Sequence, residues 1–297
     1  MTGRPVLELR GVSRIHPGGR RALDGVDLRW EPGLSALLGP NGAGKSTLMN
    51  IAATVTRPTS GQVVFDGRDT AADPDRLRRV LGYLPQNFGV YPRLTAREFL
   101  SYLAAAKGMR ARTARSRISH LLELLNLTEA ARRPLGGCSG GMLRRVGIAQ
   151  ALLTDPEVLI VDEPTAGLDP EERVRLRHLL ADLANDRIVV VSTHTVSDIE
   201  SVASDVVMIS AGRVLRRATP AELLADIAGT VWEVLVDPAE LAGYRRRFQI
   251  GAVLREPGGL RLRLVTPVRP ASHATEVAPR LEDAYLAAVQ RPSEVPG

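Results

Sequence analysis

The sequence is poor in cysteine and in long apolar runs. Cys138 is the only cysteine among 297 residues, so no internal disulfide can form and no thiolate metal site is predicted. We expect it to be a small apolar filler rather than a reactive thiol. No apolar stretch approaches the roughly 18 to 20 residues that a membrane-spanning helix needs, and the start MTGRPVLELR lacks the profile of a signal peptide. We therefore expect a cytosolic chain that reaches a membrane only through another protein.

Lysine is also scarce, although the chain as a whole is basic. Lys45 and Lys107 are the only lysines among 39 basic residues, and the net charge is +6. Between residues 101 and 150, nine basic residues stand against two acidic ones, so this segment carries +7 and the remainder −1. A basic protein can bind nucleic acid, but a local excess indicates an acidic partner, a membrane surface or simply a solvated helix face. The nine are Lys107, Arg110, Arg112, Arg115, Arg117, Arg132, Arg133, Arg144 and Arg145.

Short β-type runs alternate with helical patterns along the first 220 residues, which predicts an α/β fold. Several runs are continuously apolar, as expected of parallel strands covered on both faces. Between 95 and 153 the chain is mostly helical, with helices expected over 96–109 and 115–127 and an N-cap at Thr95 paired with Glu98. The predicted strands are 6–9, 34–38, 63–65, 80–84, 158–161, 188–192 and 206–209.

The character of the sequence changes after about Pro220. Short strands are expected at 231–236, 252–255 and 260–265, with Pro- and Gly-rich loops and a closing helix over 281–289. No long internal repeat is present, so the chain carries one large domain and not two. We predict this domain over residues 1–220 and a small accessory domain over residues 221–297.

A phosphate-binding loop is predicted at GPNGAGKST, which follows an apolar strand and precedes a helix. Its glycines let backbone N–H groups close around phosphate oxygens, and the helix N-terminus adds its positive end. Lysine stands in the loop of this arginine-rich chain, where a compact ammonium suits phosphates better than a planar fork. Ser46 is placed to coordinate Mg²⁺. The loop comprises Gly39, Pro40, Asn41, Gly42, Ala43, Gly44, Lys45, Ser46 and Thr47.

Two adjacent acids follow the apolar strand in PEVLIVDEPT. Asp162 and Glu163 are expected at the edge of the sheet where ligands bind in open α/β folds. One would hold the Mg²⁺ shell and the next could polarise a water. The alternative is a pair of solvated acids at a strand end.

These elements, in this order and spacing, resemble the ATP-binding subunit of ATP-binding cassette (ABC) transporters over about residues 5–220. The resemblance also depends on Gln86 in GYLPQNFGVYP, the SGGM signature at 139–142, Asp169 in AGLDP and His194 in VSTHTVSD. It implies a P-loop NTPase (RecA-like) core with an antiparallel β subdomain and a helical subdomain at about 87–153. By this resemblance, residues 1–220 form the ATP-binding domain, and the accessory domain is a small α+β C-terminal extension.

The resemblance also implies roles for individual residues. Lys45 and Ser46 bind the phosphates of ATP and Mg²⁺, with Asp162 in the metal shell, and Gln86 reaches the metal and the attacking water. Glu163 is the general base, and His194 contacts the γ-phosphate. Taken alone, Gln86 would be an ordinary loop residue and His194 a capping residue at a strand end.

The same resemblance answers why the chain has two glycine-rich helix starts. In the family, two cassettes pack head to tail, and Ser139, Gly140 and Gly141 of one close over the ATP held by the other. Asp169 is implied at the same nucleotide site. Alone, CSGGM could equally be a serine cap with glycines for close helix packing. Homodimer and heterodimer are both open.

The chain departs from the family pattern at three positions. Cys138 is smaller than the apolar residue usual before SGG, and Met142 replaces the common glutamine. His16 occupies the position at which many members stack a tyrosine on adenine, and a histidine stacks less extensively. The alternative for His16 is a neutral surface histidine.

The implied partner is a separate integral membrane permease, with the chain bound peripherally at the cytoplasmic face and its +7 segment facing the membrane. The tail APRLEDAYLAAV resembles the C-terminal extension of subunits that serve ABC-2 type exporters of drugs, antibiotics or polysaccharides. An ABC ATPase acting on nucleic acid is the main alternative, but the coiled-coil insertion, zinc motifs or fused second cassette typical of that group are absent. An inactive regulatory cassette is disfavoured because Lys45, Glu163 and His194 are all present.

Overall fold

The computed structural model describes residues 4–290, and the chain divides into two compact units. The first unit is formed by residues 1–204 with 209–214, and the second by residues 205–208 with 215–297. All residues predicted to bind ATP lie in the first unit. The division runs through two neighbouring strands rather than through a linker.

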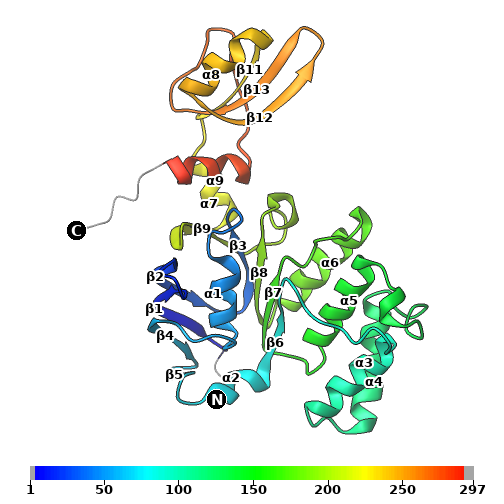
Figure 1. Ribbon diagram of the computed structural model, residues 1–297. Coiled ribbons are helices and arrows are strands. Elements are labelled where there is room, and N and C mark those ends of the chain that lie inside the picture. Colours follow the sequence, from blue (N-terminus) through cyan, green and yellow to red (C-terminus); the bar gives the residue numbers. More distant parts are fainter. Residues whose placement is uncertain (1–3, 291–297) are drawn as a thin grey trace. The chain divides into compact units, whose positions relative to one another are not determined.

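A six-stranded sheet positions the nucleotide loops (Figure 1). Its order is β10-β9-β3-β8-β7-β6, and the four strands from β3 to β6 run parallel. Every residue of β7 and β8 is buried, which confirms that their apolar runs are covered on both faces. The strands are β3 (Gly33–Leu38), β6 (Leu81–Leu84), β7 (Val158–Asp162), β8 (Ile188–Thr193), β9 (Asp205–Ser210) and β10 (Arg213–Ala218).

Helices follow these strands, and three of them pack together as a helical group (Figure 1). The capping box predicted at Thr95 is confirmed, since its hydroxyl accepts from the Glu98 N–H and Glu98 accepts from the Thr95 N–H. The predicted bounds 96–109 and 115–127 are wrong by up to four residues. The helices are α1 (Lys45–Ala52), α2 (Pro74–Val80), the group α3 (Ala96–Ala106), α4 (Ala111–Leu124) and α5 (Gly140–Ala151), then α6 (Pro170–Leu183) and the 3₁₀ turns η1 (Leu135–Gly137) and η2 (Val196–Asp198).

A second, antiparallel sheet has the order β2-β1-β4-β5. It gives the first unit the antiparallel component that the resemblance implies. One of its long strands, β2, is absent from the strands predicted from sequence. The strands are β1 (Leu7–Ile15), β2 (Arg21–Trp30), β4 (Ser60–Phe65) and β5 (Arg68–Asp69).

The second unit contains a four-stranded antiparallel sheet of order β12-β13-β11-β14 with short helices. Its three predicted strands and its closing helix are all present, with somewhat different bounds. The elements are α7 (Pro220–Ala225), β11 (Val231–Val236), η3 (Pro238–Glu240), α8 (Leu241–Arg247), β12 (Gln249–Glu256), β13 (Gly259–Val265), β14 (Thr275–Glu276) and α9 (Leu281–Gln290). Among the helices of residues 4–290, none is both long and apolar enough to cross a membrane.

A buried ion network fastens α9 to β13 in the second unit. Arg263 donates to both carboxylate oxygens of Asp283, to Glu233 at 3.1 Å and to the Ala278 carbonyl at 2.6 Å. Both Arg263 and Asp283 are buried. These bonds raise the pKa of Arg263, with the Asp283 hydrogen bond contributing most and burial opposing it.

We expect Asp283→Ala to destabilise the second unit by about 3–5 kcal/mol, because it leaves the Arg263 guanidinium buried without its main partner. Thermal unfolding followed by circular dichroism measures the change. Glu256→Gln is the matched control, since it breaks an Arg–carboxylate pair of the same sheet whose side chains are about one-third exposed. Equal melting temperatures for the two variants would contradict this assignment.

Candidate functional site

The phosphate-binding loop joins β3 to α1. Gly42 and Gly44 adopt φ values of +82° and +107°, which L side chains rarely adopt. The helix begins at Lys45, so its first backbone N–H groups lack intrahelical partners. The loop therefore presents N–H donors and the positive end of α1 in one place, as an anion site requires.

Lys45 is buried in this loop, at 6% exposure, and its ammonium is held by the loop itself. Nζ donates to the Gly39 carbonyl at 2.6 Å and the Pro40 carbonyl at 3.3 Å, and it lies 4.0 Å from Glu163 Oε1. Burial lowers the pKa of Lys45, while the Glu163 and Asp162 carboxylates oppose that shift. A buried ammonium whose hydrogen-bond partners are neutral carbonyls is suited to exchange them for charged phosphate oxygens.

We expect Gly44→Ala to abolish tight ATP binding and to destabilise the first unit by at least ~2 kcal/mol. An added Cβ would lie 2.6 Å from the Ala22 carbonyl oxygen and 2.9 Å from Leu23 Cδ2, at a φ that alanine disfavours. Calorimetric ATP titration and thermal unfolding measure both effects. In the control Gly243→Ala, the new methyl meets nothing within 4 Å. Wild-type ATP affinity in a folded Gly44→Ala protein would contradict this account of the loop.

The first of the two strand-end acids is fixed by a neighbouring strand. Asp162 ends β7, is 1% exposed, and accepts a hydrogen bond from the Ser192 hydroxyl of β8. Because β7 and β8 run parallel with Asp162 opposite Ser192, their carboxyl ends meet at one edge of the sheet. The carboxylate therefore has a defined orientation beside the phosphate loop.

The second acid meets the predicted histidine. Nδ1 of His194, which follows β8, lies 2.9 Å from both carboxylate oxygens of Glu163. Glu163 is 5% exposed, whereas the side chain of His194 is 58% exposed. The backbone of Glu163 has φ of +52°, a left-handed conformation that costs a non-glycine residue about 1–3 kcal/mol and is found mostly at functional sites. Lys45, Glu163 and His194 thus form one cluster.

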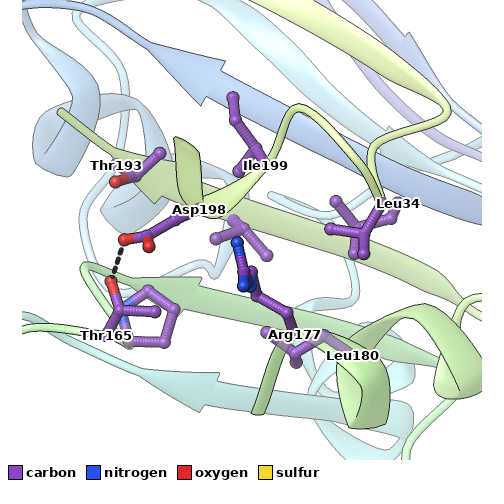
Figure 2. A pocket seen from close by; sticks show the side chains of 10 residues that line it. Leu34, Thr165, Arg177, Leu180, Thr193, Asp198 and Ile199 are labelled. Atoms are coloured by element: carbon purple, nitrogen blue, oxygen red, sulfur yellow. Dashed lines mark hydrogen bonds between the residues drawn. The ribbon is translucent and has the colours of Figure 1, made fainter. Parts of the chain in front are cut away.

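A small cavity is lined by residues of the segment after Glu163 and of the segment after His194 (Figure 2). The Thr165 hydroxyl donates to Asp198 Oδ2 at 2.6 Å, and both side chains are buried. Thr165 is two residues from Glu163, and Asp198 is four residues from His194. This bond braces the two segments that carry the catalytic candidates.

The signature residues lie at the start of α5, away from the phosphate loop. Ser139 is the N-cap, and its hydroxyl accepts from the Met142 N–H at 3.2 Å. Gly141 approaches the segment before Asp169 so closely that a Cβ would lie 3.1 Å from the Gly167 carbonyl oxygen. Within residues 4–290, no hydrogen bond or ion pair joins Ser139, Gly140 or Gly141 to the loop 39–47. Ser139 and Gly140 are exposed, so the start of α5 is a second helix N-terminus separate from that of α1.

The other predicted residues lie around these elements. His16 begins the turn after β1, and in the same turn an Arg20 nitrogen lies 3.7 Å from the position of a Cβ at Gly42. Gln86 follows β6 with an exposed side chain, and Asp169 caps α6 by accepting from the Glu172 N–H at 2.9 Å. The structure therefore places the turn of His16 over the phosphate loop.

Sequence reasoning missed one residue at the centre of the site. Arg144 of α5 is buried and donates hydrogen bonds to the backbone carbonyls of both strand-end acids and of the Gln86 loop. In the sequence it was one of nine charges in a basic segment. Burial lowers the pKa of Arg144, and the Asp162 and Glu163 carboxylates oppose that shift. In the sequence, Arg144 could have been singled out only by its position five residues after the signature serine. Its contacts are shown by the fold alone.

The site also fits a magnesium ion. Ser46, the second residue of α1, offers a hydroxyl, Asp162 a carboxylate and Gln86 an amide oxygen, which are the hard oxygen ligands that Mg²⁺ prefers. In the described part of the chain, no group of three or more His, Cys, Asp or Glu residues could hold a metal alone. Such a sparse donor set suits an ion that shares its shell with phosphates and waters.

A glycine-rich loop entering a helix, a buried lysine and an acid pair at the edge of a parallel sheet define a P-loop ATPase. The ABC transporter family model matches residues 23–166. The daunorubicin resistance ATP-binding protein DrrA3 of Streptomyces coeruleorubidus is 35% identical over 228 residues, 76% of this chain and 72% of its own. The ABC transporter ATP-binding protein YxlF of Bacillus subtilis is 41% identical over 179 residues, 60% and 59% of the two chains.

Solved structures agree with this match. The dimeric cassette MJ0796, in a post-hydrolysis state bound to ADP and phosphate, superposes with a TM-score of 0.67 at 29% identity. The match covers 72% of this chain and 98% of that one. The chain belongs to the ABC transporter family, as one of its ATP-binding subunits, and it is an ATP hydrolase. The predicted resemblance and the P-loop fold are confirmed.

Proposed function

We propose that the chain drives export through a separate membrane permease, using ATP clamped between two cassettes. The observation that supports this proposal is the cluster in which the Lys45 ammonium lies 4.0 Å and His194 Nδ1 lies 2.9 Å from the Glu163 carboxylate. In the proposal these groups act as the phosphate-binding cation, the γ-phosphate contact and the base. The drug-resistance names of relatives such as DrrA3 favour export over import. The two relatives are named as a drug-resistance and an ABC transporter ATP-binding protein, which favours transport over action on nucleic acid.

The two glycine-rich helix starts have complementary roles in this proposal. The loop 39–47 holds the phosphates of one ATP, and Ser139 to Gly141 of a partner cassette close over its γ-phosphate. MJ0796, a relative of similar fold, is a dimer. Because ADP lacks the clamped group, hydrolysis weakens the pair, and this differential affinity can drive a conformational cycle.

The proposed chemistry assigns roles to Glu163, His194 and the residues around them. Glu163 accepts the proton of the attacking water, and His194 orients that carboxylate and contacts the γ-phosphate. Ser46, Asp162 and Gln86 would hold a Mg²⁺ ion, which would supply charge neutralisation at the phosphates. In this proposal His16 stacks on the adenine, and Asp169 contributes to the nucleotide site.

Purification of the tagged chain from membranes of its native host tests whether the chain serves a membrane permease. We expect a multi-span membrane protein to co-purify in stoichiometric amount and the detergent-solubilised complex to hydrolyse ATP. Nucleic acid retained at moderate salt, with no membrane protein, would instead support the alternative of an ATPase that acts on nucleic acid.

We also propose peripheral contact between the basic face of α4 and anionic lipid at the cytoplasmic side of the membrane. Arg112 and Arg115 are exposed on α4, and Lys107 and Arg110 are exposed in the segment just before it. Arg117 does not belong to this face, contrary to the sequence-based grouping. It donates to the Leu152 carbonyl and to Asp155 at 2.9 Å, so its charge is already used within the fold.

We expect the double reversal Arg112→Glu/Arg115→Glu to lower binding to phosphatidylglycerol-containing vesicles by more than about 10-fold at low salt, because each basic residue near the surface contributes about 1 kcal/mol. Vesicle co-sedimentation measures the binding. Arg245→Glu/Arg246→Glu makes the same charge change at exposed positions of the second unit and serves as the control. Equal losses of vesicle binding for the two double variants would contradict the proposed contact between α4 and lipid.

A further inference from the structure

A buried arginine of the signature helix contacts both loops that carry the predicted catalytic side chains. Arg144 is 6% exposed and lies five residues after Ser139. One guanidinium nitrogen lies 3.2 and 3.0 Å from carbonyls at the end of β6, and the other bonds carbonyls at the end of β7, 2.7 Å away in the case of Glu163. The four carbonyls belong to Pro85, Gln86, Asp162 and Glu163.

This arrangement sets the spacing between the two loops. Arginine presents its donors in a rigid planar fork, so carbonyls bonded to its two nitrogens are held at fixed relative positions. The acceptors are main-chain atoms, so the fork constrains the backbones of Gln86 and Glu163 and leaves their side chains unbonded to it. A flexible lysine has no equivalent geometry.

The same contact supports a strained residue. Glu163 has φ of +52°, and a non-glycine residue persists there only where its surroundings determine its conformation. Its N–H donates to the Ser192 carbonyl and hydroxyl, each at 3.1 Å, and its carbonyl accepts from Arg144 at 2.7 Å and from the Ala166 N–H at 3.2 Å. Losing the arginine would remove one of the hydrogen bonds that hold this backbone and aim the carboxylate.

The helix that carries Arg144 also carries the proposed clamp for the partner's ATP. About one and a half turns of α5 separate Arg144 from Ser139, and less than one turn separates it from Gly141. One turn further on, Gly147 faces Phe88 of the Gln86 loop so closely that a Cβ would lie 2.6 Å from the ring. The helix is therefore coupled to the Gln86 loop at two successive turns.

We propose that Arg144 is a positioning residue that links the signature helix to Glu163 and Gln86 of its own chain, so that closure on the partner's ATP sets the catalytic geometry at the chain's own site. This inference rests on the proposed function of those residues. A misplacement of about 1 Å at the reacting groups can cost about 10²-fold in rate.

Arg144→Gln in the full chain tests the link. We expect kcat to fall by about 10²-fold, with the KM for ATP within about 3-fold of wild type. In the Glu163→Gln background, Arg144→Gln should leave MgATP-induced dimerisation intact. Arg144→Lys keeps the charge but not the fork, so we expect it to restore only part of kcat.

Arg145→Gln is the matched control. Arg145 is the next residue of α5, is partly buried and also donates to backbone carbonyls, but those belong to Leu125 and Asn126. We expect wild-type kcat for Arg145→Gln at a similar loss of melting temperature. If Arg144→Gln does not fold, Arg144→Lys replaces it, with an expected fall of about 10-fold in kcat at unchanged KM.

Wild-type kcat in folded Arg144→Gln or Arg144→Lys, or equal falls for the two arginines, would overturn the inference. A rise in KM that accounts for the whole loss would do the same, since it would place Arg144 in ATP binding. Absence of ATP hydrolysis by the wild-type chain and its complex would instead mean that the proposed function is wrong. The two failures are therefore distinguishable.

Discussion

Glu163→Gln is expected to lower kcat for ATP hydrolysis by about 10²–10⁴-fold while ATP binding remains. The amide has almost the same shape as the carboxylate but cannot accept the proton of the attacking water. It can still meet His194, which now lies 2.9 Å from both oxygens, so the local structure should be preserved. Steady-state phosphate release and calorimetric ATP titration measure the two quantities.

A matched control separates loss of the base from loss of charge. Glu200 is an exposed acid in the segment after His194, and Glu200→Gln makes the same chemical change away from the cluster. We expect wild-type turnover from it. If Glu163→Gln retained more than about one tenth of wild-type kcat, a different group would have to be the base.

Lys45→Ala is expected to lower kcat/KM for ATP by about 10²–10³-fold, chiefly through weaker nucleotide binding. The ammonium is buried beside the glycine-rich loop, 4.0 Å from Glu163 Oε1. Removing it leaves the phosphates of ATP without a full positive charge in the loop. Lys45→Arg should restore little, because a planar fork does not fit a pocket shaped around a point charge.

The chain provides its own control for this prediction. Lys107, the only other lysine, is exposed in the segment between α3 and α4. Lys107→Ala removes the same side chain and should leave ATP affinity unchanged. ATP binding by folded Lys45→Ala at wild-type affinity would mean that the loop 39–47 is not the phosphate site.

The nucleotide elements were predictable because their signals are local. The glycine pattern specifies a loop, and the apolar run before Asp162 specifies a buried strand that ends at the site. The long strand β2 was missed because its alternation is interrupted. Its register with β1 shifts around Gly25, where φ is +61°, so the two-residue period does not continue from Leu23 to Val26.

Helix α6 was not predicted, although its start signals are present in the sequence. Asp169 is a good N-cap and Pro170 suits the first turn, but only Leu176 and Leu180 of the helix are buried. A single i, i+4 pair is too short an apolar stripe to stand out. The segment just before the helix approaches Gly141 closely at Gly167, and no local sequence pattern shows this contact.

The arginines of the basic segment show the limit of reading charge from sequence. Arg112 and Arg115 are exposed, Arg117 is paired with Asp155, and Arg144 is buried among backbone carbonyls. These outcomes differ because tertiary neighbours supply acceptors to some of the side chains and not to others. The partner of a long side chain is decided by elements distant in sequence, such as the ends of β6 and β7.

The molecular mass of Glu163→Gln in solution tests the central claim most directly. With saturating MgATP, we expect light scattering to report twice the mass of one chain, and a single chain with ADP. Gly141→Asp added to the same protein should prevent the doubling while ATP still binds, because a carboxylate would face the partner's γ-phosphate. A single-chain mass for Glu163→Gln fully loaded with ATP, with no partner cassette that restores pairing, would contradict the clamp between two cassettes.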